Sequence, residues 1–149
     1  MFDKKKFKMT LVRDVKQPSR SGSDAGIDFF IPNDFNTSTI LPGESLCIPS
    51  GVKVIIPKDH VGIFFNKSGV AIKGLIIGAC VIDSSYRGEV HIDLHNISRN
   101  HIIIEPGQKI TQMLLQPISL QNFQLITEVE YEKNKTSRGS GGFGSTGKF

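Results

Sequence analysis

The feature that most constrains the fold is a series of short apolar runs separated by turn residues. Proline-led turns occur at four places: Pro32-Asn33, Pro42-Gly43, Pro57-Lys58-Asp59 and Pro106-Gly107. Between them, β-branched and aromatic residues are concentrated in eight runs: Lys8–Val15, Ser45–Ile56, Val61–Phe65, Ile76–Ile82, Glu89–Asn96, Ile102–Ile104, Ile110–Pro117 and Phe123–Tyr131. Short strands at this spacing are typical of an antiparallel sandwich or barrel. The sequence therefore predicts an all-β fold, and 149 residues suit a single domain.

One helical turn and a glycine-rich end complete the expected organisation. Only Ser68–Lys73 is expected to be helical, and Gly74 follows it as a helix stop. Arg138–Phe149 contains five glycines, and ordering so many glycines costs too much entropy for a packed strand or helix. Composition alone predicts a loose tail, although its Arg and Phe are unusual in a passive linker. We expect a basic extension over residues 1–7, a β-barrel over 8–132 and a flexible arm over 133–149.

Charge is concentrated at the two ends of the chain. Residues 1–20 carry seven basic and two acidic side chains, and residues 133–149 carry four basic and no acidic ones. The middle has seven basic and twelve acidic residues. A nucleic-acid binder usually has a basic stripe over its folded body, so this pattern favours a small polyanion held by an arm.

Several classes of partner and location are disfavoured by the same composition. No apolar run approaches the roughly 20 residues of a membrane helix, and the basic start lacks the apolar stretch of a signal peptide. Two cysteines favour a reducing setting over a disulfide scaffold. We expect a cytoplasmic protein, or one inside a host cell if the chain is viral, with no nucleic-acid or membrane partner.

A predicted hairpin brings together the first candidate site residues. If its loop is centred between Ser85 and Tyr86, opposing residue numbers sum to 171, so that Cys80 faces His91. Asp83 then lies at the mouth of the hairpin, where a carboxylate can activate a water molecule. The alternatives are a turn aspartate that bonds its own backbone and a tyrosine that only packs.

Three other positions are chemically suggestive. Ser68 opens the predicted helical turn after Lys67, where a phosphate would be attracted, although Ser68 is also a common N-cap residue. Asp28 is flanked by apolar residues, which predicts that it is buried and paired. Gln112 lies inside an apolar run, so it needs a partner or a ligand.

Two motif matches are weaker. Gly142–Gly147 fits GxGxxG and Gly142–Lys148 fits GxxxxGK, but no helix follows, so neither nucleotide-binding motif is accepted. Closely spaced glycine amides and Arg138 still suit an anion. His91, Asp93 and His95 share one strand face and would suit zinc, whereas the alternative is a solvated face backed by a buried one.

Taken in order, five segments resemble the trimeric dUTP pyrophosphatase (dUTPase) family. They are Ala25–Phe29, Lys67–Ala71, Gly78–Asp83 with Tyr86-Arg87-Gly88, Gly107–Gln112 and Arg138–Gly147. The resemblance implies a jelly-roll-like β-barrel and a homotrimer with sites shared between chains. It also implies hydrolysis of dUTP to dUMP and pyrophosphate, with Mg2+ on the triphosphate.

The resemblance also implies roles for individual residues. Asp83 would activate the water that attacks the α-phosphorus, and Tyr86 would pack against deoxyribose. Asp28 would reach a metal at most through water. The remaining positions would bind substrate, through uracil, the phosphates or the closing arm: Lys67, Ser68, Gly69, Cys80, Val81, Ile82, His91, Gln112, Arg138, Phe143 and Gly144.

The chain departs from the family pattern at a few positions, and other functions stay open. Lys67 replaces an arginine, which loses bidentate phosphate geometry. Cys80, Ser85 and Gln108-Lys109 also differ from the common residues. The first alternative function is dCTP deamination, for which Glu89 is the nearest acid/base candidate. The second is a non-catalytic trimeric binding module, and an added protein partner is compatible with any of these functions.

Overall fold

The computed structural model describes residues 6–142, 145 and 147, which fall into two units, Met1–Ser119 and Leu120–Phe149. The described part of the first unit contains ten strands and one helix: β1 Lys8–Leu11, β2 Ile27–Phe30, β3 Ser38–Ile40, β4 Ser45–Ile55, β5 His60–Asn66, α1 Ser68–Ala71, β6 Leu75–Gly78, β7 Val81–Ile82, β8 Glu89–Asn96, β9 Ile102–Ile104 and β10 Lys109–Pro117. The second unit contains the helix α2, Glu128–Glu132. The fold is mostly β, as the sequence predicted.

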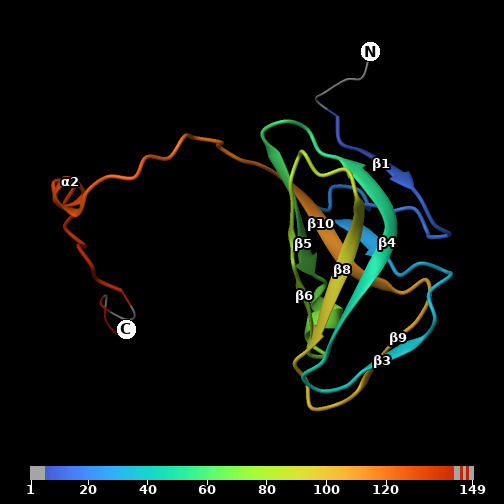
Figure 1. Cartoon of the computed structure of the whole chain (residues 1–149). Coiled ribbons are helices and arrows are strands. Elements are labelled where there is room, and N and C mark those ends of the chain that lie inside the picture. The colour runs from blue at the N-terminus through green and yellow to red at the C-terminus, as the bar shows by residue number, and fades with distance from the viewer. Residues whose placement is uncertain (1–5, 143–144, 146, 148–149) are drawn as a thin grey trace. The chain divides into compact units, whose positions relative to one another are not determined.

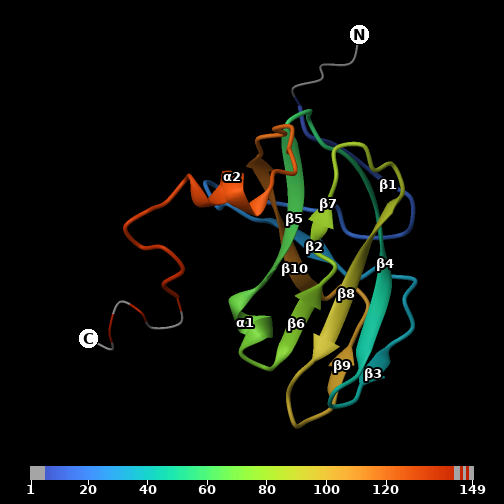
Figure 2. The ribbon, with the colours of Figure 1, turned by 60° about the vertical axis from the view of Figure 1, so that its left-hand side comes forward.

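The strands of the first unit form two four-stranded antiparallel sheets and one strand pair. Their orders are β1-β4-β8-β6, β2-β10-β5-β7 and β3-β9. The two larger sheets face each other, and the β3–β9 pair lies at one end of them (Figures 1 and 2). Neighbouring strands are therefore often far apart in the sequence, so the turns alone do not define the sheet order.

The core lies between the facing sheets because the strands alternate buried and accessible residues. In β8, Val90, Ile92 and Leu94 are buried, whereas the intervening residues are at least partly accessible. The rings of Phe29 and Phe64 meet edge to face at 5.0 Å between centroids, a favourable aromatic arrangement. This alternation directs the odd-numbered residues of β8 away from the core.

Most of the predicted strands are confirmed. β8 and β9 match the predicted bounds, and β4, β5 and β10 differ from prediction by a single residue at one or both ends. β2 and β3 were not predicted. The predicted helical turn is present as α1, and Gly74 after it has φ +81°, a conformation that favours glycine.

Two predictions of secondary structure are wrong. The run Ile76–Ile82 is divided into β6 and β7, because Ala79 has φ +45° and turns the chain out of the first sheet. Phe123–Tyr131 is no strand, and it includes part of α2. There, Thr127 and Glu130 form a reciprocal capping box, a local signal that outweighs the β-branched composition. In the described part of the chain, no helix is long and apolar enough to cross a bilayer.

Candidate active site

The predicted hairpin register is correct over its first four pairs only. Leu75 pairs with Asn96 and Gly78 with Asp93, so the residue numbers sum to 171. After Ala79 the chain pairs with β5 instead, through Val81 and Ile82. Cys80 and His91 are therefore not register partners, contrary to prediction. The Cys80 thiol points back to the Ile77 carbonyl at 3.7 Å, and burial, with the nearby Asp93 charge, raises its pKa.

The break between β6 and β7 creates a cavity of about 400 Å3 beside β8. Five of the predicted site residues line it: Val81, Ile82, Asp83, Tyr86 and His91. The other lining residues are Cys47, Ala79, Val90 and Asp93. Asp93 shares a strand face with His91 by period two, a signal that the sequence contained. Cys47 gave no such signal, because only the pairing of β4 with β8 places it opposite Asp93.

The loop at the mouth of this cavity is shaped by hydrogen bonds between residues that are close in the sequence. The Tyr86 amide donates to the Asp83 carbonyl at 3.1 Å, which closes a turn and leaves the Asp83 side chain exposed. The Tyr86 hydroxyl donates to the Glu89 carbonyl at 2.8 Å. The ring lies over Gly88, where an added Cβ would be 2.3 Å from the Tyr86 hydroxyl oxygen. Glycine at 88 is thus required for this ring position.

The β8 face that would suit zinc carries no group of three side chains arranged to hold a metal ion. Ile92 and Leu94 are buried on its reverse side, and the Asp93 carboxylate lies 2.9 Å from His95 Nε2. The Nδ1 atom of His91 lies 3.0 Å from the Glu89 carbonyl. Within residues 6–142, 145 and 147, no cluster of three His, Cys, Asp or Glu side chains is arranged to hold a metal ion.

A second cavity, of about 460 Å3, brings together three more of the predicted residues. Asp28, Lys67 and Gln112 line it, together with Asp24, Ala25, Gly26, Phe65, Asn66 and Leu114. Gln112 donates from Nε2 to the Asn66 carbonyl at 2.9 Å. An added Cβ at Gly26 would lie 2.1 Å from Gln112 Oε1, so this glycine makes room for the Gln112 side chain.

Asp28 is paired with two lysines, as the prediction of a partner required, but it is only partly buried, with 18% of its side chain exposed. Its carboxylate oxygens contact Lys67 Nζ at 2.5 Å and Lys109 Nζ at 2.7 Å. Burial raises the pKa of Asp28, but the hydrogen bonds from Lys109 and Lys67 outweigh it, so the pKa is lowered overall. Lys109 is a site neighbour that sequence reasoning did not assign. The result is a pair of ammonium groups held beside the cavity.

The remaining predicted residues lie outside these cavities. Lys67, not Ser68, is the N-cap of α1, so the alternative role of Ser68 is wrong. Ser68 and Gly69 follow it and are exposed. In the second unit, Arg138 is exposed and donates from Nε to the Gly141 carbonyl at 2.9 Å. Phe143 and Gly144 lie outside the described residues.

Comparison with known proteins identifies the family. The dUTPase family profile matches residues 14–147. The chain is 37% identical over 150 residues to the deoxyuridine 5'-triphosphate nucleotidohydrolase of Desulfitobacterium hafniense, covering 95% of this chain and 96% of the relative. Its Mus musculus counterpart is 35% identical over 133 residues, covering 88% of this chain and 78% of the relative.

A solved structure extends the match to three dimensions. The Staphylococcus bacteriophage 80alpha dUTPase with dUpNHpp superposes with a TM-score of 0.82 at 27% identity, covering 95% of this chain and 98% of that chain. Sequence relatives and fold therefore agree with the five ordered motifs. The chain belongs to the dUTPase family.

Proposed function

We propose that the protein hydrolyses dUTP to dUMP and pyrophosphate. The observation that supports this most strongly is the cavity between β7 and β8, where Asp83 and Tyr86 lie on one tight turn. The curated relatives are named for this nucleotide, and the phage structure contains dUpNHpp. A cavity of about 400 Å3 is within the usual range for small-molecule sites, so it suits the nucleoside part of dUTP.

In the proposed reaction, the Asp83 carboxylate orients a water molecule and takes its proton. The water oxygen forms a bond to the α-phosphorus, and the bond from that phosphorus to the bridging oxygen breaks. Pyrophosphate leaves with the electron pair, and the proton passes from Asp83 to solvent. Asp83 suits this task because its side chain is exposed at the cavity mouth and its backbone is fixed by the turn.

Selection of uracil and deoxyribose is assigned to the cavity walls. The backbone of Cys80, Val81 and Ile82, with His91, is proposed to form hydrogen bonds with the edge of uracil. A close-fitting backbone site leaves no room for the methyl of thymine and no partner for the amine of cytosine. Tyr86 is proposed to pack against the sugar, where its ring would occupy the volume of a 2'-hydroxyl.

The phosphates are assigned to the second cavity and to the arm, residues 133–149. Lys67, Ser68, Gly69 and Gln112 are proposed to contact them, and charge neutralisation is the main requirement of phosphoryl transfer. Arg138 would hold the γ-phosphate. Phe143 would stack over the base, with Gly144 beside it.

Magnesium is best regarded as part of the substrate, entering as the complex of Mg2+ with the triphosphate. The described residues offer no cluster of protein ligands for it. Both oxygens of Asp28 contact lysine ammonium groups, which is unfavourable for direct coordination of a dication. Any contact from Asp28 would therefore pass through water.

The two cavities support a trimer with shared sites. The two cavities have no lining residue in common. A single chain therefore keeps the Asp83 turn apart from Lys67 and Gln112. Hydrolysis of dUTP needs both the water activation proposed for Asp83 and the phosphate contacts proposed for the second cavity. A symmetric oligomer can supply the two from neighbouring chains. Mixing equal amounts of Asp83→Asn and Gln112→Ala subunits should restore about one quarter of the parental activity. Activity no higher than that of the two variants would exclude sharing of these residues.

The deaminase alternative is disfavoured by the surroundings of Glu89. Its carboxylate accepts hydrogen bonds from Arg13 and from the Gly51 amide, and the Arg13 bonds lower its pKa. A carboxylate held in its ionised form is a poor proton donor.

One assay separates the three functions. The protein is incubated with each nucleoside triphosphate, and pyrophosphate and ammonia are both measured. Pyrophosphate from dUTP, lost in Asp83→Asn, supports the proposal. Ammonia from dCTP would support deamination, and binding of dUTP without either product would support a non-catalytic module.

A further inference from the structure

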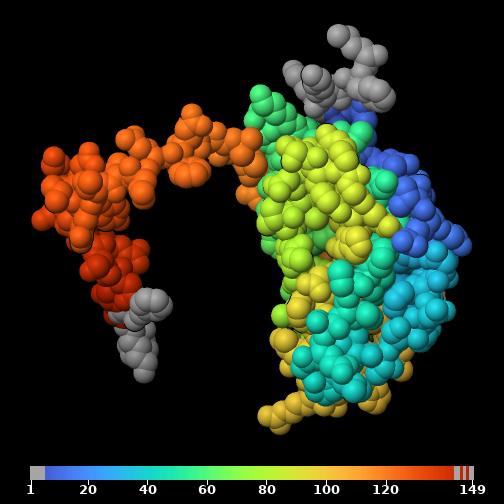
Figure 3. Space-filling view, viewed as in Figure 1, coloured from blue at the N-terminus to red at the C-terminus, as the bar shows by residue number. Residues whose placement is uncertain are grey.

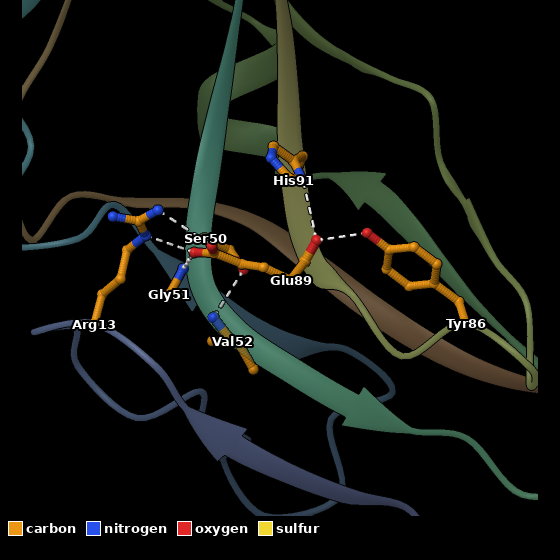
Figure 4. Close-up of polar contacts among 7 residues, drawn as sticks. All are labelled: Arg13, Ser50, Gly51, Val52, Tyr86, Glu89 and His91. Atoms are coloured by element: carbon orange, nitrogen blue, oxygen red, sulfur yellow. Dashed lines mark hydrogen bonds and ion pairs between the residues drawn. The ribbon is translucent and has the colours of Figure 1, made fainter.

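The loop that bears Asp83 and Tyr86 is anchored at its far end by a polar cluster. We define the anchor cluster as Arg13, Gly51, Tyr86, Glu89 and His91, drawn with their neighbours in Figure 4. Its members come from the N-terminal segment, a bulge in β4, the loop, and the start of β8. In the space-filling view, N-terminal residues, in blue, lie next to the loop before β8, in yellow-green (Figure 3).

The carboxylate of Glu89 is fixed by three hydrogen bonds. Arg13 donates from Nε at 2.7 Å and from Nη2 at 3.2 Å, one bond to each oxygen, which is the fork geometry of strong arginine pairs. The Gly51 amide donates to Oε1 at 2.8 Å. The Glu89 side chain is 17% exposed and that of Arg13 is 40% exposed, so the carboxylate is shielded from solvent more than the guanidinium that binds it.

The Gly51 amide is available for this bond because β4 bulges there. Register passes from the pair Pro49–His91 to the pair Lys53–Glu89, so three residues of β4 oppose one residue of β8. Gly51 has φ +77°, and an added Cβ would lie 2.7 Å from Val15 Cγ1. The bulge therefore requires glycine, and its amide is bound by the Glu89 side chain.

The backbone carbonyl of Glu89 holds two residues of the cavity wall. It accepts the Tyr86 hydroxyl at 2.8 Å and lies 3.0 Å from His91 Nδ1 (Figure 4). A carbonyl oxygen has two lone pairs, so it can accept both bonds when His91 is protonated at Nδ1. The side chain of Glu89 thus fixes the strand end, and its carbonyl fixes the proposed sugar-packing ring.

We infer that Glu89, locked by Arg13 and Gly51, is a positioning residue that sets discrimination between deoxyribose and ribose through Tyr86. This inference rests on the proposed function. Glu89 does not line the cavity, so it acts by holding the Tyr86 ring over Gly88. Loss of its carboxylate releases the strand end, so the ring no longer excludes a 2'-hydroxyl.

The composition of the chain provides a direct probe of that ring. The sequence has two tyrosines and no tryptophan, and Tyr131 is 68% exposed on α2. In a Tyr131→Phe background, tyrosine fluorescence therefore reports Tyr86 alone. Glu89→Ala should lower its anisotropy and raise its quenching by acrylamide. In the same variant the preference for dUTP over UTP in kcat/KM should fall by about five- to tenfold. Glu89→Gln, which keeps an acceptor oxygen, should give intermediate values.

Two comparisons distinguish positioning from general destabilisation. Ile92→Val truncates a buried residue of the same strand, so it should lower Tm without changing either readout. Tyr86→Phe removes the hydroxyl bond, and adding Glu89→Ala to it should cost no further discrimination, because both changes break one linkage. The inference is overturned if the losses of dUTP-over-UTP preference in the two variants add in the double variant. It is also overturned if Glu89→Ala keeps the parental anisotropy and the parental preference. If the parent does not hydrolyse dUTP, the proposed function fails, and fluorescence still decides whether Glu89 holds Tyr86.

Discussion

The loop 79–91 and the second unit, Leu120–Phe149, both contain predicted site residues but are held in opposite ways. The loop has local hydrogen bonds, from Tyr86 to Asp83 and to Glu89, but its end is also held by residues far away in the sequence: Arg13 and Glu89 are 76 positions apart, and Gly51 and Glu89 are 38 apart. In the second unit, the bonds of Thr127 to Glu130 and of Arg138 to Gly141 span three positions.

This difference indicates when each region acquires its working geometry. The long-range bonds of Glu89 hold the end of the loop on the packed strands, and the local bond from Tyr86 closes the Asp83 turn, so we expect this geometry to be set before substrate arrives, which lowers the cost of aligning the reaction. In the second unit the bonds described above are local, and the described side chains are mostly exposed. We therefore expect the arm to be positioned by the ligand, as closing lids commonly are.

The largest expected effect comes from Asp83, the residue most dependent on that pre-set geometry. Asp83→Asn should reduce turnover by about a thousandfold, because an amide cannot take a proton from water. Nucleotide binding and Tm should stay close to parental. Pyrophosphate release and binding of a non-hydrolysable dUTP analogue measure the two effects.

A matched control for this change is Asp59→Asn. Asp59 is an exposed turn aspartate with φ +61°, a conformation that asparagine also tolerates. This variant should keep full activity. Turnover of Asp83→Asn within a few-fold of the parent would remove Asp83 from the role of base.

Removing the arm tests the expectation that the second unit is positioned by the ligand. Deletion from Ser137 onward should lower dUTP hydrolysis by about a hundredfold or more, because Arg138 can no longer stabilise the γ-phosphate. Tm and oligomer mass should hardly change, since none of the described residues from Ser137 onward belongs to the buried core. Binding of dUMP should suffer less than binding of a dUTP analogue. A truncated protein with the parental rate would show that the arm is a passive tail.

Tyr86→Ala sharpens the comparison within the loop. The preference for dUTP over UTP in kcat/KM should fall by about tenfold or more, while dUTP hydrolysis itself falls less. The physical reason is the space left by the ring, which would admit a 2'-hydroxyl. Steady-state kinetics with both nucleotides measure the ratio, and an unchanged ratio would leave Tyr86 a packing residue only.

The smallest expected effect is on stability, and it differs between the two units. Asp28→Asn should lower Tm at pH 7 by about 5 °C, because Lys67 and Lys109 lose their shared carboxylate. Since the pKa of Asp28 is lowered, its contribution is present at neutral pH and is lost as pH falls through the folded-state pKa. The Tm difference from the parent should therefore narrow below about pH 4.

Glu130→Gln is the counterpart in the second unit. The pKa of Glu130 is also lowered, by hydrogen bonds from the Thr127 amide and hydroxyl, but its side chain is exposed. Calorimetry between pH 3 and pH 7 should detect no shift in the barrel transition. A shift as large as that of Asp28→Asn would contradict the division into long-range and local contacts.

Sequence periodicity predicted much of the barrel, and the motifs predicted residues of the candidate site. The alternation of β8 and the hairpin centre gave the register of Leu75–Gly78 against β8 correctly, because both depend on neighbouring residues. The ordered motifs also contain the predicted site residues that line the two cavities, except His91. Gly26 and Gly88, in two of these motifs, make room for Gln112 and Tyr86.

Tertiary structure decided the features that no local pattern encodes. The transfer of Val81 and Ile82 to β5, the pairing of Lys109 with Asp28, and the Arg13–Glu89 bond each join distant segments. Conversely, the β-branched residues at 123–131 favoured a strand, yet the first unit is complete at Ser119 and the capping box forms a helix. A strand needs a partner to bond with, and only the packed fold determines which segments find one.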